Sequence, residues 1–365
     1  MTVIVEAVDL VKEFGSSGGL FRPAQKVYAV SGVSLTIHQG ETFAIVGESG
    51  CGKSTLARLL SRLLAPTSGD VRIAGESVST LKGAALRALR SKIQFIFQDP
   101  FSSLNPRMSV GALITEPMEV HRPDLSASQR RAQAAQLLNK VGLRAAHMDR
   151  YPHEFSGGQR QRIGIARALA ANPQILVGDE PVSALDVSVQ AQVINLLTDL
   201  KTDFGLTLII VAHDLAVVRH MSDRIAVMYL GRIVEIGSAD DITSKPFHPY
   251  TQALISAVPE ASVGASHNPI LLEGEIPSPK NPPSGCRFRT RCPHARPICA
   301  TQSPQLEQVA PDHQVACHFH NEITRIGFET TTKALPDAAR QRFAMFRNAV
   351  TPKKSTNIQQ QGEEK

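Results

Sequence analysis

The sequence predicts an α/β protein with a parallel core sheet, an antiparallel β-layer, a helical subdomain and a small, loop-rich C-terminal domain that contains cysteines. Three observations support this fold class. An apolar run at 42–46 leads through a glycine-rich turn into an amphipathic run. Two further apolar runs, at 175–177 and 207–212, end in polar residues, as buried parallel strands do at their ligand-binding edge. From residue 246 onward prolines recur and four cysteines gather.

The chain is long enough for more than one domain. It has 365 residues, whereas single hydrophobic cores tend to stop growing at about 250–300 residues. We expect a first domain at 1–245 with a helical subdomain at about 98–170, a second domain at 246–322, and a tail at 323–365 that is partly helical and then disordered.

Composition excludes some functional classes. The net charge of +6 fits an anionic nucleotide or a negatively charged membrane surface, and it does not require nucleic acid as a partner. Acidic residues near the start, such as Glu6 and Asp9, predict that no secretory signal is present. No apolar run approaches the roughly 18 residues needed to span a bilayer. We therefore expect a cytosolic protein, or a peripheral subunit if it serves a membrane.

The glycine-rich turn predicts a phosphate-binding P-loop. Its strand and helix context is the one this motif requires. Glycines let successive backbone N–H groups converge on an anion, and the helix N-terminus adds positive potential. Lys53 is expected to reach the β- and γ-phosphates, and the Ser54 hydroxyl to bind Mg²⁺. The loop comprises Gly47, Glu48, Ser49, Gly50, Cys51, Gly52, Lys53, Ser54 and Thr55.

The N-terminal part reads as β-structure. Residues 2–46 alternate apolar and polar side chains, apart from a Gly/Ser-rich loop that begins at Gly15. An aromatic ring near this loop could stack on a purine base. The candidates are Phe14, Phe21 and Tyr28. After the P-loop helix we expect a hairpin strand at 71–73, a helix at 81–92 and a strand at 93–97.

The middle of the chain is mainly helical. We expect helices over 108–150, with Ser126 as the N-cap of 127–141, and a further helix at 160–171. Ser156 is an N-cap candidate for the last of these, and the two glycines that follow permit another molecule to approach the helix N-terminus. Since the chain has one P-loop, this second anion-binding device is expected to serve a nucleotide held by a partner.

Two further strands end in chemically useful groups. Asp179 and Glu180 follow 175–177, where an aspartate can hold Mg²⁺ and a glutamate can polarise a water for attack on the γ-phosphate. His213 lies just past 207–212, on the ligand-binding edge. A helix is expected at 187–204, and the sheet is expected to close with strands at 224–228 and 233–235.

Together these motifs resemble the motif series of ABC-transporter ATPase domains over residues 3–245. The series is the P-loop, Gln98, the run Phe155-Ser156-Gly157-Gly158-Gln159, Asp179-Glu180, Ser183-Ala184-Leu185-Asp186 and His213. Two segments, 98–107 and 246–251, more narrowly resemble the dipeptide/oligopeptide/nickel importer branch, as does the cysteine-rich C-terminal extension.

The resemblance implies a role for each motif. Lys53, Ser54 and the loop backbone bind ATP and Mg²⁺, with Asp179 and Gln98 as further metal ligands. Gln98 also senses the γ-phosphate and links to the membrane subunits. Glu180 acts as catalytic base and His213 clamps the γ-phosphate. Phe14 is implied as the adenine-stacking residue. Ser156, Gly157, Gly158 and Gln159 close over ATP of the opposing subunit, and Asp186 couples the two sites.

The resemblance also implies the setting. The implied protein is an ATP-hydrolysing subunit of a binding-protein-dependent importer, with di- or oligopeptides as cargo. Its implied place is the cytoplasmic face of the bacterial inner membrane. Its partners are a homologous ATPase, as a heterodimer rather than a homodimer, two integral membrane permease subunits and, indirectly, a solute-binding protein. The alternatives are the same machinery importing nickel, glutathione or an opine, or a soluble non-transport ABC ATPase. Leucine is more usual than Phe155, and a residue with a side chain more usual than Gly178, but no reacting group is lost.

The C-terminal cysteines predict a metal site. Cys286, Cys292, Cys299 and Cys317 lack the tight pairs usual for zinc. Iron–sulfur ligands tolerate irregular spacing, and a Cys-Pro step such as Cys292-Pro293 is familiar there. We therefore expect a [4Fe–4S] cluster, with zinc as the alternative and unligated or disulfide-bonded cysteines as the third. For zinc, the substitute ligands are His294, His313 and His318.

Two last expectations concern the rest of this region. Its basic residues are expected to form a solvated face: Arg287, Arg289, Arg291 and Arg296. In the tail, Asp337 is expected to cap a short helix over 338–350.

Overall fold

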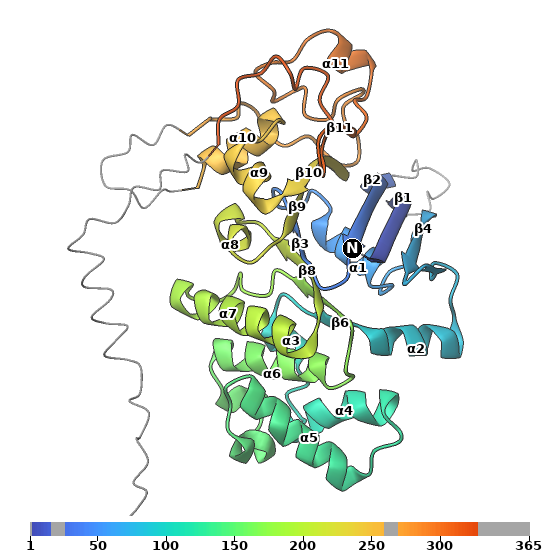
Figure 1. Cartoon of the computed structure of the whole chain (residues 1–365), viewed down its shortest axis with the longest axis vertical. Helices are drawn as coiled ribbons and strands as arrows, with labels where there is room; N and C mark the ends of the chain where they lie inside the picture. Colours follow the sequence, from blue (N-terminus) through green and yellow to red (C-terminus); the bar gives the residue numbers. More distant parts are fainter. Residues whose placement is uncertain (1, 16–25, 259–268, 328–365) are drawn as a thin grey trace, which may run out of the picture. The chain divides into compact units, whose positions relative to one another are not determined.

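The computed structural model describes residues 2–15, 26–258 and 269–327 (Figure 1). Its framework is an eight-stranded sheet in the order β11-β12-β10-β9-β3-β8-β7-β6. The parallel strands are β3 (Thr42–Val46), β6 (Ile93–Ile96), β7 (Ile175–Asp179), β8 (Thr207–Ala212) and β9 (Arg224–Tyr229). Three antiparallel strands continue the sheet: β10 (Arg232–Ser238), β11 (Glu307–Ala310) and β12 (His313–Val315). The predicted parallel core is confirmed.

A second, four-stranded sheet forms the expected antiparallel layer in the order β2-β1-β4-β5. Its strands are β1 (Val3–Gly15), β2 (Lys26–His38), β4 (Ser68–Ile73) and β5 (Glu76–Ser77). The alternation read from the sequence is the reason for this layer, because Val5, Ala7 and Leu10 of β1 are buried.

Helices cover the large sheet and form a separate group beside it. The first part of the chain contributes α1 (Lys53–Leu60), α2 (Gly83–Lys92), α3 (Pro100–Ser103), α4 (Val110–His121), α5 (Ala127–Lys140), two 3-10 turns (Ala145–Asp149 and Pro152–Glu154) and α6 (Gly157–Leu169). The rest contributes α7 (Val187–Phe204), α8 (Leu215–Arg219), α9 (Ala239–Ser244), α10 (Pro249–Ser256) and α11 (Ile298–Thr301). Helices α4, α5 and α6 pack on one another (Figure 1). As predicted, Ser126 caps α5, in a reciprocal box with Gln129.

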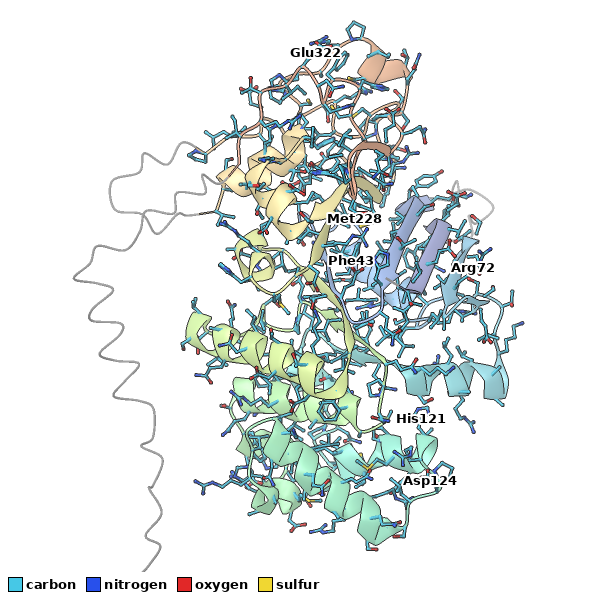
Figure 2. All side chains as sticks on the ribbon, viewed as in Figure 1. Phe43, Arg72, His121, Asp124, Met228 and Glu322 are labelled. Carbon is cyan, nitrogen blue, oxygen red and sulfur yellow. The ribbon has the colours of Figure 1, made fainter. Side chains whose placement is uncertain are left out.

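Strand β3 explains why the large sheet lies at the centre of the molecule. All its residues are buried, and alternate ones face two different apolar clusters. Ala44 and Val46 belong to the cluster that includes the helical group, whereas Phe43 and Ile45 belong to the cluster shared with the antiparallel layer. Figure 2 shows Phe43 inside the molecule and Arg72 at its surface. The strand that leads into the P-loop is therefore fixed from both faces.

The C-terminal region joins the large sheet through β12, which pairs with β10 so that Val315 lies opposite Glu235. The Glu235 carboxylate is fully buried and accepts hydrogen bonds from the backbone N–H groups of Phe247 and His248. His313 Nε2 lies 2.8 Å from its Oε1. His313 is thus committed to Glu235 and is no substitute zinc ligand. Loops were expected throughout this region, whereas the structure forms two short strands there, β11 and β12.

The parallel strands bring the sequence motifs to one edge of the sheet. Val46 of β3 lies opposite Ala212 of β8, and Asp179 of β7 lies opposite Val211. The P-loop, Asp179-Glu180 and His213 therefore follow neighbouring carboxyl ends, as do the residues after β6.

Some expectations fall on parts of the chain that the structure does not describe. These are Phe21, most of the Gly/Ser-rich loop, and the tail with its helix at 338–350. Within the described ranges, none of the helices combines the length and the apolar character needed to cross a bilayer.

Candidate functional site

The P-loop turns between β3 and α1 and ends in a buried lysine. Lys53 is 4% exposed, and its Nζ donates to the backbone carbonyls of Gly47 at 2.8 Å and Glu48 at 3.0 Å. These two hydrogen bonds hold the ammonium group inside the loop, close to where phosphates would lie. An arriving anion would offer stronger, charge-assisted hydrogen bonds than these neutral carbonyls do.

Two glycines of the loop are required by geometry. Gly47 has φ +149°, and a Cβ there would lie 2.2 Å from the Met228 carbonyl oxygen. Gly52 has φ +106°, and its Cβ would lie 2.1 Å from the Ala29 carbonyl oxygen. Both contacts are with backbone atoms, which cannot move aside easily. Any larger residue would therefore distort the loop.

The groups expected to hold Mg²⁺ meet at the start of α1. Ser54 Oγ donates to Asp179 Oδ1 at 2.6 Å, and Asp179 is 1% exposed. Arg58 Nη2 lies 3.5 Å from the other carboxylate oxygen. A hydroxyl and a carboxylate next to a phosphate loop are the oxygen ligands that Mg²⁺ prefers. The residues therefore fit this ion, which would neutralise negative charge on the phosphates when bound.

The other two predicted catalytic residues, Gln98 and His213, lie next to the Glu180 carboxylate. Gln98 Nε2 donates to Glu180 Oε2 at 2.8 Å, and His213 Nδ1 lies 3.9 Å from the same oxygen. Glu180 adopts φ +45°, an uncommon conformation for a side chain of its size, and its N–H donates to the Val211 carbonyl. A cavity of about 40 Å³ adjoins Glu180 and His213, enough room for a water molecule. A carboxylate held in this way can orient and deprotonate a water.

The second anion-binding device begins α6. The Ser156 hydroxyl accepts from the Gln159 N–H, and Gln159 Oε1 accepts from the Ser156 N–H, which completes a capping box. A Cβ on Gly158 would lie 2.5 Å from Val189 Cγ1 on α7. Asp186, just before α7, is exposed and caps nothing with its side chain. The device belongs to the helical group, whereas α1, which follows the P-loop, contacts β7 and β8 of the large sheet (Figure 1).

The candidate stacking residue Phe14 lies at the end of β1, opposite Val27 of β2. It is 43% exposed, and Lys12 Nζ lies 5.2 Å from its ring centroid. An exposed ring with a cation on one face leaves the other face for a base. Tyr28, the alternative, donates its N–H to the Pro279 carbonyl.

One expectation about the basic residues was wrong. Arg291 does not belong to a solvated face: its side chain is 8% exposed and forms a two-pronged ion pair with Glu48 of the P-loop. Arg287 is also inside, where it donates to the Leu230 carbonyl. The sequence carried no local signal for the ion pair, because 243 residues separate its partners.

The cysteine cluster is only partly as expected. Each of the five cysteines is a free thiol, so the disulfide alternative is wrong. Burial raises the pKa of Cys292 to about 11 and that of Cys317 to about 12, and neighbouring thiols of the cluster contribute to both shifts. Yet no group of three or more His, Cys, Asp or Glu side chains in the described ranges has the geometry to hold a metal ion. The structure thus gives no support to an assembled [4Fe–4S] or zinc site.

Two family models match the chain. One, described as "ABC transporter", matches residues 30–183, and the other, described as "Oligopeptide/dipeptide transporter, C-terminal region", matches residues 234–299. Three relatives match over most of their length. The oligopeptide transport ATP-binding protein AppF of Bacillus subtilis is 51% identical over 87% of this chain and 98% of its own length. OppF of Escherichia coli is 52% identical over 86% and 96%, and the dipeptide transport protein DppF of E. coli is 48% identical over 86% and 93%.

Solved structures agree with the fold. A dimer of the bacterial ABC transporter cassette MJ0796 superposes with a TM-score of 0.58 at 31% identity, covering 65% of this chain and 99% of that one. The same cassette bound to ADP and Pi in a post-hydrolysis state gives a TM-score of 0.58 at 32% identity, with the same coverage.

Proposed function

This chain belongs to the ABC transporter family and is one of its ATPases, and from that premise we propose that it powers a binding-protein-dependent importer of oligopeptides or dipeptides. One observation carries the cargo class. Relatives that are about half identical to this chain, over nearly their whole length, are named oligopeptide or dipeptide transport ATP-binding proteins. The match to the oligopeptide/dipeptide C-terminal region supports the same assignment.

We further propose the roles of the site residues. Lys53 and the backbone of the P-loop hold the ATP phosphates, and Phe14 stacks on adenine. Ser54, Asp179 and Gln98 hold Mg²⁺. Glu180 takes a proton from the attacking water, and His213 clamps the γ-phosphate and that water. Gln98 senses the γ-phosphate, links to the membrane subunits and keeps the Glu180 carboxylate oriented. The hydrogen bond from Gln98 to Glu180 Oε2 supports this division, because it orients the carboxylate of the base.

The second anion-binding device, at the start of α6, is proposed to act on a second ATPase. Ser156, Gly157, Gly158 and Gln159 would close over ATP held by a homologous subunit, and Asp186 would couple the two sites. The exposure of Ser156, Gln159 and Asp186 at the start of α6 and α7 supports this role, as does the 82% exposure of neighbouring Val187. A heterodimer rather than a homodimer is proposed.

The assembly proposed around this pair contains two integral membrane permease subunits and, indirectly, a solute-binding protein. The chain would lie at the cytoplasmic face of the bacterial inner membrane as a peripheral subunit, without a nucleic-acid partner. Within the chain, we propose an ATPase domain at 1–245 with its helical subdomain at about 98–170, a C-terminal domain at 246–322 and a tail at 323–365.

The cargo proposal predicts that the chain supports peptide uptake. In cells lacking the chain, uptake of a labelled tripeptide is expected to fall to background and to return with the wild-type chain but not with Lys53→Ala. A second expectation is that the permease subunits co-purify with the tagged chain from detergent extracts. Unchanged peptide uptake together with loss of nickel, glutathione or opine uptake would show that the cargo is that other solute and not a peptide. Failure to co-purify with any integral membrane protein would refute the importer.

The finer proposal for the cysteines is a [4Fe–4S] cluster bound by Cys286, Cys292, Cys299 and Cys317, with zinc as the alternative. What supports it is the convergence of four free thiols, which electrostatically influence one another. Their described geometry is not that of a metal site, so we derive no step of the reaction from the cluster. Such a group would act as a cross-link for a region with little core of its own.

Removal of this group gives a direct test. Protein prepared without oxygen is expected to be brown and to contain about four iron atoms per chain, the number in one such cluster. Chelation after oxidation should bleach it and lower the melting temperature. Cys292→Ser should lose the iron, whereas Cys51→Ser, outside the cluster, should keep it. Colourless protein with stoichiometric zinc would favour the alternative, and protein free of both metals would refute the site.

A further inference from the structure

An ion pair joins the C-terminal region directly to the P-loop. Arg291 Nη1 lies 2.7 Å from Glu48 Oε2, and Nη2 lies 3.1 Å from Oε1. This parallel arrangement is the strongest geometry available to an arginine and a carboxylate. The Arg291 side chain is 8% exposed and that of Glu48 is 24% exposed, so water screens the pair only weakly.

Glu48 is held at its backbone as well. Its N–H donates to Tyr250 Oη at 2.8 Å, and Tyr250 is fully buried on α10. The Phe288 ring packs against Tyr250, with centroids 5.4 Å apart. Both the charge and the backbone of this loop residue are therefore fixed by side chains that follow residue 245 in the sequence.

The C-terminal region also supports the P-loop indirectly, through the turn between β9 and β10. Arg287 donates to the Leu230 carbonyl at the turn between β9 and β10. The next residue in that turn, Gly231, donates its N–H to the Cys51 carbonyl of the P-loop at 2.7 Å. Two neighbouring arginines of the C-terminal region thus reach the P-loop, one directly and one through a single turn.

The sign of the charges gives this contact a functional meaning. Glu48 carries a carboxylate in a loop proposed to bind a triphosphate, and an uncompensated negative charge there would repel the ligand. The carboxylate in turn raises the pKa of Arg291, so the guanidinium stays charged. Arg291 cancels the Glu48 charge and also holds the loop in shape.

We propose that Arg291 is a positioning residue for nucleotide binding: through Glu48 it makes the ATP affinity of the P-loop depend on the seating of the C-terminal region. This inference rests on the proposed function of the P-loop. The inference assigns a task to the C-terminal region. Its arginine neutralises the Glu48 carboxylate, so that the P-loop can bind an anion. Arg291 touches no reacting atom, so it acts on affinity rather than on the chemical step.

The test compares Arg291→Gln with a matched variant, Arg296→Gln. Arg296 lies in the same region and pairs with Glu322 at 2.6 Å, but Glu322 lies at the outer end of that region, far from the P-loop (Figure 2). The Kd of the full chain for MgATP is measured by displacement of a fluorescent ATP analogue. Arg291→Gln is expected to raise Kd about tenfold, which corresponds to about 1.4 kcal/mol of binding free energy. Arg296→Gln should change it less than about twofold, as exposed ion pairs contribute little.

Charge compensation makes a prediction that a purely structural contact does not. Glu48→Gln alone should bind MgATP at least as tightly as wild type, because the unpaired arginine then adds positive charge near the phosphates. The double variant Glu48→Gln/Arg291→Gln should recover most of the affinity lost in Arg291→Gln. In turnover assays, Arg291→Gln should raise KM for ATP and leave kcat nearly unchanged. Arg291→Lys should give an intermediate KM.

Each alternative outcome is distinct. A folded Arg291→Gln with wild-type Kd overturns the inference while leaving the proposed function intact. If Arg291→Gln does not fold, Glu48→Gln decides, and weaker ATP binding in that variant would overturn the compensation. A wild-type chain that binds no ATP would overturn the proposed function and this inference with it.

Discussion

Replacing Glu180 with glutamine is expected to lower ATP hydrolysis by about 10²–10⁴-fold, the usual contribution of a general base. The amide keeps the size and the hydrogen-bonding reach of the carboxylate, but it cannot accept a proton from water. ATP affinity should remain near the wild-type value, because Glu180 lies outside the loop that holds the phosphates. The measurement is phosphate release by the assembled transporter, together with the Kd of the isolated chain for MgATP.

The control for Glu180→Gln is Glu6→Gln on β1, which removes a partly exposed carboxylate that pairs only weakly with Arg72 at 3.4 Å. It should hydrolyse ATP at the wild-type rate. Because Gln98 donates to the Glu180 carboxylate, glutamine at 180 can still receive that hydrogen bond through its carbonyl oxygen. A loss of activity in Glu180→Gln is therefore a loss of basicity and not of position. Full hydrolysis by Glu180→Gln would remove Glu180 from the catalytic role.

The parts of the site that could be predicted are those with a local cause. A glycine-rich turn between an apolar strand and a helix is compatible with few local structures. The P-loop accordingly lies between β3 and α1, as predicted. The paired acids after β7 and the histidine after β8 were predictable for a related reason. Parallel strands bring their carboxyl ends to one edge, so three separate motifs must meet there. The hydrogen bond from Ser54 to Asp179, across 125 residues, follows from that topology.

The parts that could not be predicted depend on long-range pairing. Strands β11 and β12 have four and three residues, too few to show a period in the sequence. They exist because β10 offers an edge for pairing. In the same way, Arg291 looked like one of several exposed arginines until the fold placed Glu48 opposite it. The convergence of the four cysteines was expected from composition, but the geometry of a metal site was not found.

Replacing Lys53 with alanine is expected to weaken MgATP binding on the order of 100-fold. A hydrogen bond to a charged group contributes about 1.5–3 kcal/mol, and each 1.4 kcal/mol corresponds to about tenfold in affinity. Lys53 would form such bonds to two phosphates. In the structure its Nζ donates to the Gly47 and Glu48 carbonyls, so the substitution also leaves these two loop acceptors without that donor. The Kd is measured as for Arg291→Gln, and hydrolysis should fall with it at cellular ATP concentration.

The matched control is Lys140→Ala, which removes an exposed lysine paired with Asp203 on the helical group and should leave Kd unchanged. Lys53→Ala and Glu180→Gln then separate the two halves of the reaction. The first should lose binding and, through it, turnover, whereas the second should bind ATP and hold it. A pair of ATPases that contains one Lys53→Ala subunit is informative. In the proposed arrangement each ATP is held by the P-loop lysine of one subunit and covered by the second anion-binding device of the other, so only the site with the missing lysine should lose ATP binding. Undiminished ATP affinity in a folded Lys53→Ala would show that the phosphates are held elsewhere, and the P-loop assignment would fall.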